Sequence, residues 1–145
     1  MAWELMNEPR CQVDYTGKTI NVRHMLSGQN ENAQMTFMQR WITSHWTDSR
    51  AIIKKPLIFA EFGKSTKDPG YSITARNSFL STIYSSIYNL ARNGGTLGGG
   101  LVWQLMAPGM ESYDYGYEIV LSQNPSTNVV IAEQSNKMMA LEHMI

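Results

Sequence analysis

Hydrophobic and polar positions change their spacing along the chain, and each change predicts a structural element. From about Asn32, apolar and aromatic positions recur every three or four residues, which is the period of one helix face. This helix is predicted to run to Ile53 or Lys54, because Lys54 and Lys55 suit a helix C-terminus and Pro56 stops the helix. Its apolar face is predicted to hold Phe37, Met38, Trp41, Ile42, His45 and Trp46.

The same period predicts two further helices. One runs from about Ser72 to Arg92 and ends at the glycine-rich cap Asn93-Gly94-Gly95. The other is capped by Ser126 or Thr127 and contains Val130, Ile131, Met138 and Leu141.

Short apolar runs alternate with these helices and predict strands. They are Ala2–Met6, Leu57–Ala60 and Leu101–Leu105. Runs that are apolar on both faces are typical of a parallel sheet covered by helices, so the predicted fold class is α/β. In such sheets the working residues follow the carboxyl ends of the strands. Glu8, Glu61 and Trp103 lie at or near these ends.

Composition excludes several function classes. The 145 residues are enough for one domain with a core, and 12 basic against 12 acidic residues give no electrostatic reason to propose nucleic acid or an anionic membrane as partner. No apolar run reaches the roughly 20 residues of a membrane-spanning helix, and the N-terminus lacks the pattern of a signal peptide. Cys11 is the single cysteine, and no spacing of ligands predicts a metal or cofactor site.

Two glutamates at neighbouring strand ends point to glycoside hydrolysis. One carboxylate can attack the anomeric carbon while the other protonates the leaving oxygen and then activates water. An exposed tryptophan nearby can stack on a sugar ring, and Trp103 has that place. Each residue also has an ordinary interpretation, because a glutamate at a strand end is usually a loop-edge acid and a tryptophan is usually core.

Four segments together resemble one enzyme family. AWELMNEPRC (residues 2–11) resembles the acid/base segment of glycoside hydrolase family 5, KPLIFAEFGKS (55–65) its nucleophile segment, and GGGLVWQLMAPGM (98–110) its eighth strand with a sugar-stacking tryptophan. DYGYEIVLSQNPST (114–127) is similar to the plant endo-β-mannanases in particular.

This resemblance implies roles for four residues. Glu8 matches the general acid/base, Glu61 the nucleophile, Asn7 the residue that bonds the sugar 2-hydroxyl, and Trp103 the aromatic platform. The implied reaction is retaining hydrolysis of internal β-1,4-mannosidic bonds in mannan, glucomannan and galactomannan, with no metal or other cofactor. The implied partner is therefore a β-mannan polysaccharide, and the implied location is the extracellular cell wall.

The chain departs from the family in its length. A (β/α)8 barrel typically needs about 250 residues, and Glu8 and Glu61 are 61 − 8 = 53 residues apart where the family has two further strand–helix units. We therefore expect one incomplete catalytic domain over residues 1–145, a partial TIM barrel that resembles strands 4, 7 and 8 and lacks strands 1–3 and 5–6. A non-catalytic remnant that binds mannan weakly or pairs with another chain is the alternative function, and action on a β-1,4-glucan is the alternative substrate.

Overall fold

The computed structural model describes residues 31–94 and 97–142. Its internal contacts divide the chain into residues 1–37 and 38–145. Of the first unit, the described residues form the beginning of one helix, and the remaining description concerns the second unit. The predicted strand Ala2–Met6, together with Asn7 and Glu8, lies outside the described residues.

The first helix has the extent that the sequence predicts. α2 spans Glu31–Asp48 and continues as a π-helical turn, η1, over Ser49–Ile53. Lys54 ends it in the left-handed conformation with φ 56°, and its N–H donates to the carbonyl of Ser49 at 2.7 Å. The predicted stop before Pro56 is therefore confirmed.

The buried face of α2 is confirmed at Ile42 and is wrong at His45. Ile42 is 1% exposed, and the Trp41 ring packs against Phe59 with centroids 5.5 Å apart. His45 instead stays exposed, with Nδ1 2.9 Å from the carbonyl oxygen of Trp41 and its ring tilted 34° against the Trp41 indole, with centroids 4.1 Å apart. The helix backbone thus supplies a partner for its polar ring, which needs no place in the core.

The described strands form a parallel pair, as predicted. β1 spans Leu57–Phe62 and β2 spans Leu97–Val102, with Leu57 opposite Leu97 and Ala60 opposite Leu101. The alternation of helix and strand and this parallel pairing confirm an α/β fold.

The predicted position of the second strand is wrong by four residues at its start. The structure begins β2 at Leu97 and includes three glycines that the apolar pattern did not reveal. One of them, Gly100, lies so close to α3 that a Cβ there would be 2.6 Å from Cδ1 of Ile87. Backbone packing thus replaces side-chain packing, and Leu105 is left outside the strand in an isolated bridge with Ile119.

Burial of β1 is one-sided, which corrects the prediction of strands buried on both faces. Phe59 and Phe62 are buried, whereas Ile58 is 47% exposed and Ala60 is also exposed. Leu101 of β2 is 61% exposed. The helices of the described chain cover only one face of the sheet, so alternate residues of each strand remain accessible.

The other two helices lie near their predicted positions. α3 spans Ile73–Gly94, and the Ser72 hydroxyl accepts the N–H of Ala75 at 3.0 Å. α4 spans Pro125–Glu142. The predicted cap of α4 at Ser126 or Thr127 is wrong, because Asn124 accepts the first helical N–H bond at 2.9 Å and proline occupies the first helical position.

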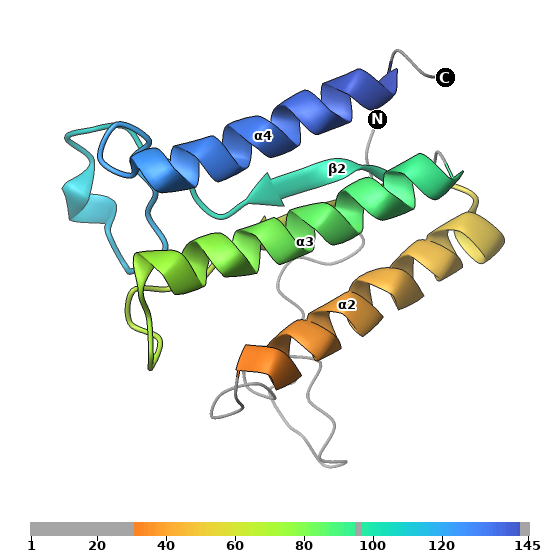
Figure 1. Cartoon of the computed structure of the whole chain (residues 1–145), viewed down its shortest axis with the longest axis horizontal. Coiled ribbons are helices and arrows are strands. Elements are labelled where there is room, and N and C mark those ends of the chain that lie inside the picture. The colour runs from red at the N-terminus through yellow and green to blue at the C-terminus, as the bar shows by residue number, and fades with distance from the viewer. Residues whose placement is uncertain (1–30, 95–96, 143–145) are drawn as a thin grey trace. The chain divides into compact units, whose positions relative to one another are not determined.

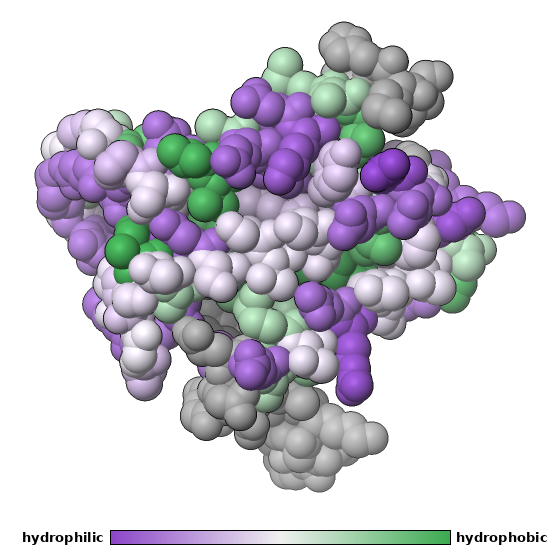
Figure 2. Space-filling view, viewed as in Figure 1, coloured by the Kyte–Doolittle hydropathy of each residue, from purple (hydrophilic) through white to green (hydrophobic). Residues whose placement is uncertain are grey.

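The helices and the sheet enclose one hydrophobic core. Figure 1 shows α3 between α4 and α2, with β2 alongside α3. The core residues are Ile42, Phe59, Phe62, Leu80, Ile83, Tyr84, Ile87, Ala91, Leu97, Ile119 and Leu141. On the face seen in Figure 2, polar and neutral residues predominate. Within residues 31–94 and 97–142, no helix combines the length and apolar composition that a membrane crossing requires.

Candidate active site at the strand ends

Glu61 occupies a distorted position at the end of β1. The register between β1 and β2 shifts between Ala60 and Phe62, so Glu61 is the extra residue of a β-bulge. Its φ is 61°, in the left-handed region that non-glycine residues rarely adopt, and its side chain is exposed. Bulges and left-handed residues concentrate where a fold must re-aim a side chain, which makes Glu61 a functional candidate on structural grounds alone.

Phe62, the residue after this bulge, links the end of β1 to the end of β2 through its carbonyl oxygen. The N–H of Trp103, just past β2, donates to the carbonyl oxygen of Phe62 at 2.8 Å. Gly63 allows this approach, because a Cβ there would lie 2.2 Å from the Trp103 carbonyl oxygen. Trp103 and Glu61, two of the predicted site residues, are therefore brought to the same edge of the sheet.

Phe62 anchors this edge in the core. Its ring meets Tyr84 of α3 edge-on, with centroids 5.4 Å apart. Burial raises the pKa of Tyr84 to about 12, so its phenol stays neutral in the core. The Phe62 side chain is thus held in the core, whereas Glu61 beside it is exposed.

The Trp103 side chain is held at its polar atom. Its indole N–H donates to the hydroxyl oxygen of Tyr115 at 2.6 Å, while the side chain remains 37% exposed. Tyr115 in turn lies near Tyr117, with ring centroids 6.0 Å apart. The end of β2 and the loop after it therefore carry a group of three aromatic side chains, and the end of β1 carries the exposed carboxylate of Glu61.

A carboxylate organises the loop that carries Tyr115. Glu118 accepts the backbone N–H groups of Tyr115 and Gly116, each at 2.7 Å. Burial raises the pKa of Glu118, but hydrogen bonds from Asp114 and from backbone N–H groups outweigh it and lower the pKa to about 2. The same hydrogen bond to Glu118 raises the pKa of Asp114 above its usual value.

A buried arginine fixes the far end of this loop. Arg76 of α3 is 2% exposed and donates to the Glu118 carbonyl oxygen at 3.4 Å, to the Asn124 side chain, and to the Thr127 hydroxyl at 3.1 Å. Burial lowers the pKa of Arg76, and Tyr71 opposes this shift. The loop is therefore bonded to α3 and to the start of α4.

The structure brings together two of the four predicted site residues. Glu61 and Trp103 lie at the ends of the paired strands β1 and β2, whereas Asn7 and Glu8 lie outside the described residues and their placement stays a prediction. Sequence reasoning missed Tyr115 and Glu118. The tyrosines and acids of residues 111–118 were visible, but no periodic pattern ties a loop residue to a strand end.

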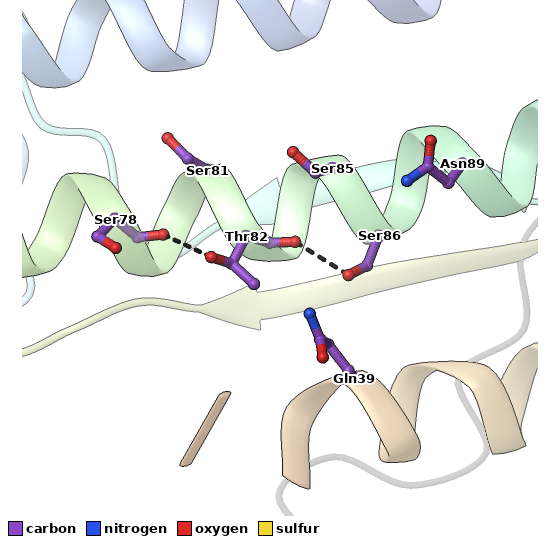
Figure 3. Close-up of a pocket in the computed structure, with 7 residues that line it drawn as sticks. All are labelled: Gln39, Ser78, Ser81, Thr82, Ser85, Ser86 and Asn89. Carbon is purple, nitrogen blue, oxygen red and sulfur yellow. Dashed lines mark hydrogen bonds between the residues drawn. The ribbon is translucent and has the colours of Figure 1, made fainter. Parts of the chain in front are cut away.

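A pocket among the described residues lies away from the strand ends (Figure 3). It is an open hollow between α2 and α3 lined by Gln39, Ser78, Ser81, Thr82, Ser85, Ser86 and Asn89. Two of its hydroxyls are occupied by the helix backbone, since Thr82 donates to the Ser78 carbonyl and Ser86 to that of Thr82, both at 3.0 Å. No titratable side chain lines it, so the strand ends remain the candidate site.

The described part of the chain offers no group of three or more His, Cys, Asp or Glu side chains that could hold a metal ion.

No family model matches the chain. Curated proteins nevertheless match all or nearly all of its residues. Mannan endo-1,4-beta-mannosidase 5 of Solanum lycopersicum is 42% identical over 209 residues, which cover all of this chain and 50% of that protein. Mannan endo-1,4-beta-mannosidase 1 of Oryza sativa subsp. japonica is 36% identical over 204 residues, covering 95% of this chain and 47% of that protein. The chain thus spans about half the length of these curated relatives.

The alignment lengths reveal an internal gap. The 209 aligned positions exceed the 145 residues of the chain, so at least 209 − 145 = 64 positions of the tomato relative face no residue here. Mannan endo-1,4-beta-mannosidase 4 of Solanum lycopersicum is 43% identical over 129 residues, which cover 89% of the chain. Because 89% of 145 residues is about 129, that alignment contains no large gap. The gap therefore lies close to one end of the chain. That it lies between Glu8 and Glu61 stays a prediction.

Proposed function

Because the chain belongs by its sequence to the plant mannan endo-1,4-beta-mannosidases of glycoside hydrolase family 5, we propose that it takes part in the endo-hydrolysis of β-1,4-mannosidic bonds. The proposed substrates are mannan, glucomannan and galactomannan, with Glu61 as nucleophile and Glu8 as general acid/base. Such a substrate would place the working protein at the cell wall.

The position of Glu61 is the observation that carries this proposal. An exposed carboxylate on a left-handed bulge is a costly arrangement, because a non-glycine residue there loses about 1–2 kcal/mol. The fold keeps that residue at a strand end where an exposed indole is also fixed. A nucleophile and a sugar-stacking surface are the two parts that a glycosidase needs on this side of its substrate.

The proposed mechanism has two steps. The Glu61 carboxylate attacks the anomeric carbon while Glu8 gives its proton to the departing glycosidic oxygen, which forms a glycosyl ester and releases the leaving saccharide. Glu8 then takes a proton from water, whose oxygen attacks the anomeric carbon and frees Glu61. Two inversions give net retention at that carbon, with Asn7 bonding the 2-hydroxyl and Trp103 stacking on the ring.

The test is release of reducing ends from soluble galactomannan by the purified chain. We expect Glu61→Gln to reduce hydrolysis to the background rate, because an amide cannot form the glycosyl ester. Glu133→Gln is the matched control, since Glu133 is an exposed glutamate of α4 away from the strand ends, and it should retain the parent rate. Equal activity of Glu61→Gln and parent would refute the assignment.

A second substrate separates the two carboxylates. Glu8→Gln should fail on galactomannan but still react with a dinitrophenyl β-mannobioside, whose leaving group needs no proton. The glycosyl-enzyme should then accumulate and add the mass of one mannobiosyl group. Glu61→Gln should form no such adduct. If the parent hydrolyses a soluble β-1,4-glucan and not mannan, the proposed substrate is wrong and the substrate is a β-1,4-glucan.

The internal gap favours a second candidate function, a non-catalytic mannan-binding chain. At least 64 positions of the tomato relative have no counterpart here, so parts of that relative's fold are missing from this chain. A folded sample that binds manno-oligosaccharides through Trp103 without cleaving galactomannan would establish this function and exclude catalysis by the chain alone.

A further inference from the structure

The indole of Trp103 is held by one hydrogen bond, and that bond assigns a task to Tyr115. We propose that Tyr115 is a positioning residue, whose hydroxyl fixes the Trp103 indole so that its face is presented to a β-1,4-linked manno-oligosaccharide. The choice of ligand rests on the proposed function, whereas the positioning itself rests on the contacts of the described residues.

Trp103 needs such a partner because its backbone and its side chain are restrained differently. The backbone is fixed by the N–H bond to Phe62 at 2.8 Å. The side chain is 37% exposed, and an exposed side chain samples several rotamers unless its polar atom is bound. An indole has a single polar atom, the donor Nε1, and the Tyr115 hydroxyl accepts its proton at 2.6 Å.

Tyr115 can fix the indole because its own backbone is fixed. Its N–H and that of Gly116 both donate to the Glu118 carboxylate at 2.7 Å, and the Gly116 carbonyl accepts the N–H of Thr66 at 2.7 Å. Thr66 belongs to the loop that follows β1. The backbone that carries the phenol is therefore held by bonds that reach back to the loop after β1.

Contacts on the ring restrain Tyr115 further. Its ring packs near Tyr117 at 6.0 Å, while Tyr115 remains 45% exposed. A half-exposed tyrosine in a fixed backbone could act in two ways on a saccharide. It could hold Trp103 in place, or it could touch the sugar directly, and the two roles give different results in a double-mutant cycle.

The variant that isolates the hydrogen bond is Tyr115→Phe, which removes the hydroxyl and keeps the ring. Loss of one such bond should raise the Kd for β-1,4-mannohexaose about two- to tenfold, measured by calorimetric titration of the full chain. The matched control is Tyr113→Phe, because Tyr113 lies in the same loop, is 66% exposed and is outside this series of bonds. Its Kd should equal that of the parent.

The double-mutant cycle with Trp103→Phe decides between the two roles. If Tyr115 acts through Trp103, the effect of Tyr115→Phe on the Kd should vanish in the Trp103→Phe background. An effect that persists there would overturn the proposal in favour of direct sugar contact, and the absence of any effect in the parent background would overturn it as well.

Trp103 fluorescence tests the positioning role of Tyr115 without any saccharide, so this test does not depend on the proposed function. Subtracting the emission of Trp103→Phe from that of the parent isolates Trp103 among the four tryptophans. Iodide should quench this emission more strongly in Tyr115→Phe and to the parent extent in Tyr113→Phe. If the parent binds no manno-oligosaccharide, the proposed function fails, and unchanged quenching in Tyr115→Phe would still refute the positioning role.

Discussion

Glu61 has an unfavourable backbone conformation, and the side chain receives no burial in return. It is an exposed residue with φ 61° inside a strand. A left-handed conformation costs an L-residue about 1–2 kcal/mol, whereas glycine adopts it freely. Selection for stability alone would favour glycine here, so the presence of a carboxylate indicates that the side chain has a use.

Two substitutions at Glu61 measure this strain. We expect Glu61→Gly to be more stable than Glu61→Ala by about 1 kcal/mol, because only the alanine has a Cβ that clashes in the left-handed region. At an ordinary strand position alanine is instead the more stable residue, by about 0.5–1 kcal/mol. Ala60→Gly, one residue earlier, measures that ordinary difference. Urea unfolding of all three variants and the parent gives the free energies. If Glu61→Gly is the less stable of the pair, the backbone at residue 61 is unstrained.

At the scale of elements, the site depends on loops that are bonded to each other and to the helices. The loop after β1 meets the loop after β2 through the Thr66 to Gly116 bond, and Arg76 ties the second loop to α3. The Glu118 carboxylate satisfies two backbone N–H groups at the turn that carries Tyr115. Ionisation of Glu118 should therefore control the order of this loop.

The pKa of Glu118 predicts a window of pH dependence. A carboxyl whose folded pKa is lowered contributes stability above its unfolded pKa and loses that stability as pH falls toward the folded value. Between the ordinary value of 4.5 and about 2, the parent should lose stability as Glu118 takes up a proton. Asp114 opposes this, since its raised pKa favours folding as the pH falls.

Glu118→Gln tests that window. The amide keeps one acceptor and loses the other, so we expect about 0.5–1 kcal/mol lower stability at pH 7 for this partly exposed group. The pH dependence between 4.5 and 2 should become flatter than in the parent, as followed by thermal unfolding. The control Glu133→Gln should show the same pH dependence of stability as the parent. If Glu118→Gln also shows the parent's pH dependence, the Glu118 carboxylate does not order the loop.

For the whole molecule, the core lies on one side of a two-stranded sheet in the described part of the chain. The helices bury Phe59 and Phe62, whereas Ile58 and Leu101 of the same sheet are 47% and 61% exposed. A complete barrel would bury both faces of each strand. That the chain forms one incomplete domain over residues 1–145 stays a prediction.

A matched pair of leucines tests one-sided burial. Leu80→Ala should cost about 2–5 kcal/mol, because Leu80 is 0% exposed in the core. Leu101→Ala makes the same chemical change at a side chain that is 61% exposed, and it should cost less than about 1 kcal/mol. Both values come from urea unfolding at one protein concentration. An equal cost at Leu101 would mean that another part of the protein covers that face.

Prediction from the sequence succeeded where a pattern is local. The helices over residues 31–53, 73–94 and 125–142 follow from apolar spacing and from proline and glycine at their ends, because helical hydrogen bonds join residues four apart. Prediction failed at β2, where the glycines leave no apolar pattern. It also failed at His45, which has the helical spacing of the apolar face but is exposed in the folded chain.

The sequence by itself determined the resemblance to the plant endo-β-mannanases, the α/β alternation and the candidates Glu8, Asn7, Glu61 and Trp103, because these depend on residue identity and order. Only the tertiary structure decided that Glu61 lies on a strained bulge, that Tyr115 holds Trp103, and that the sheet is buried on one face. These features arise from contacts between segments distant along the chain. No local period encodes such contacts, so the folded arrangement alone reveals them.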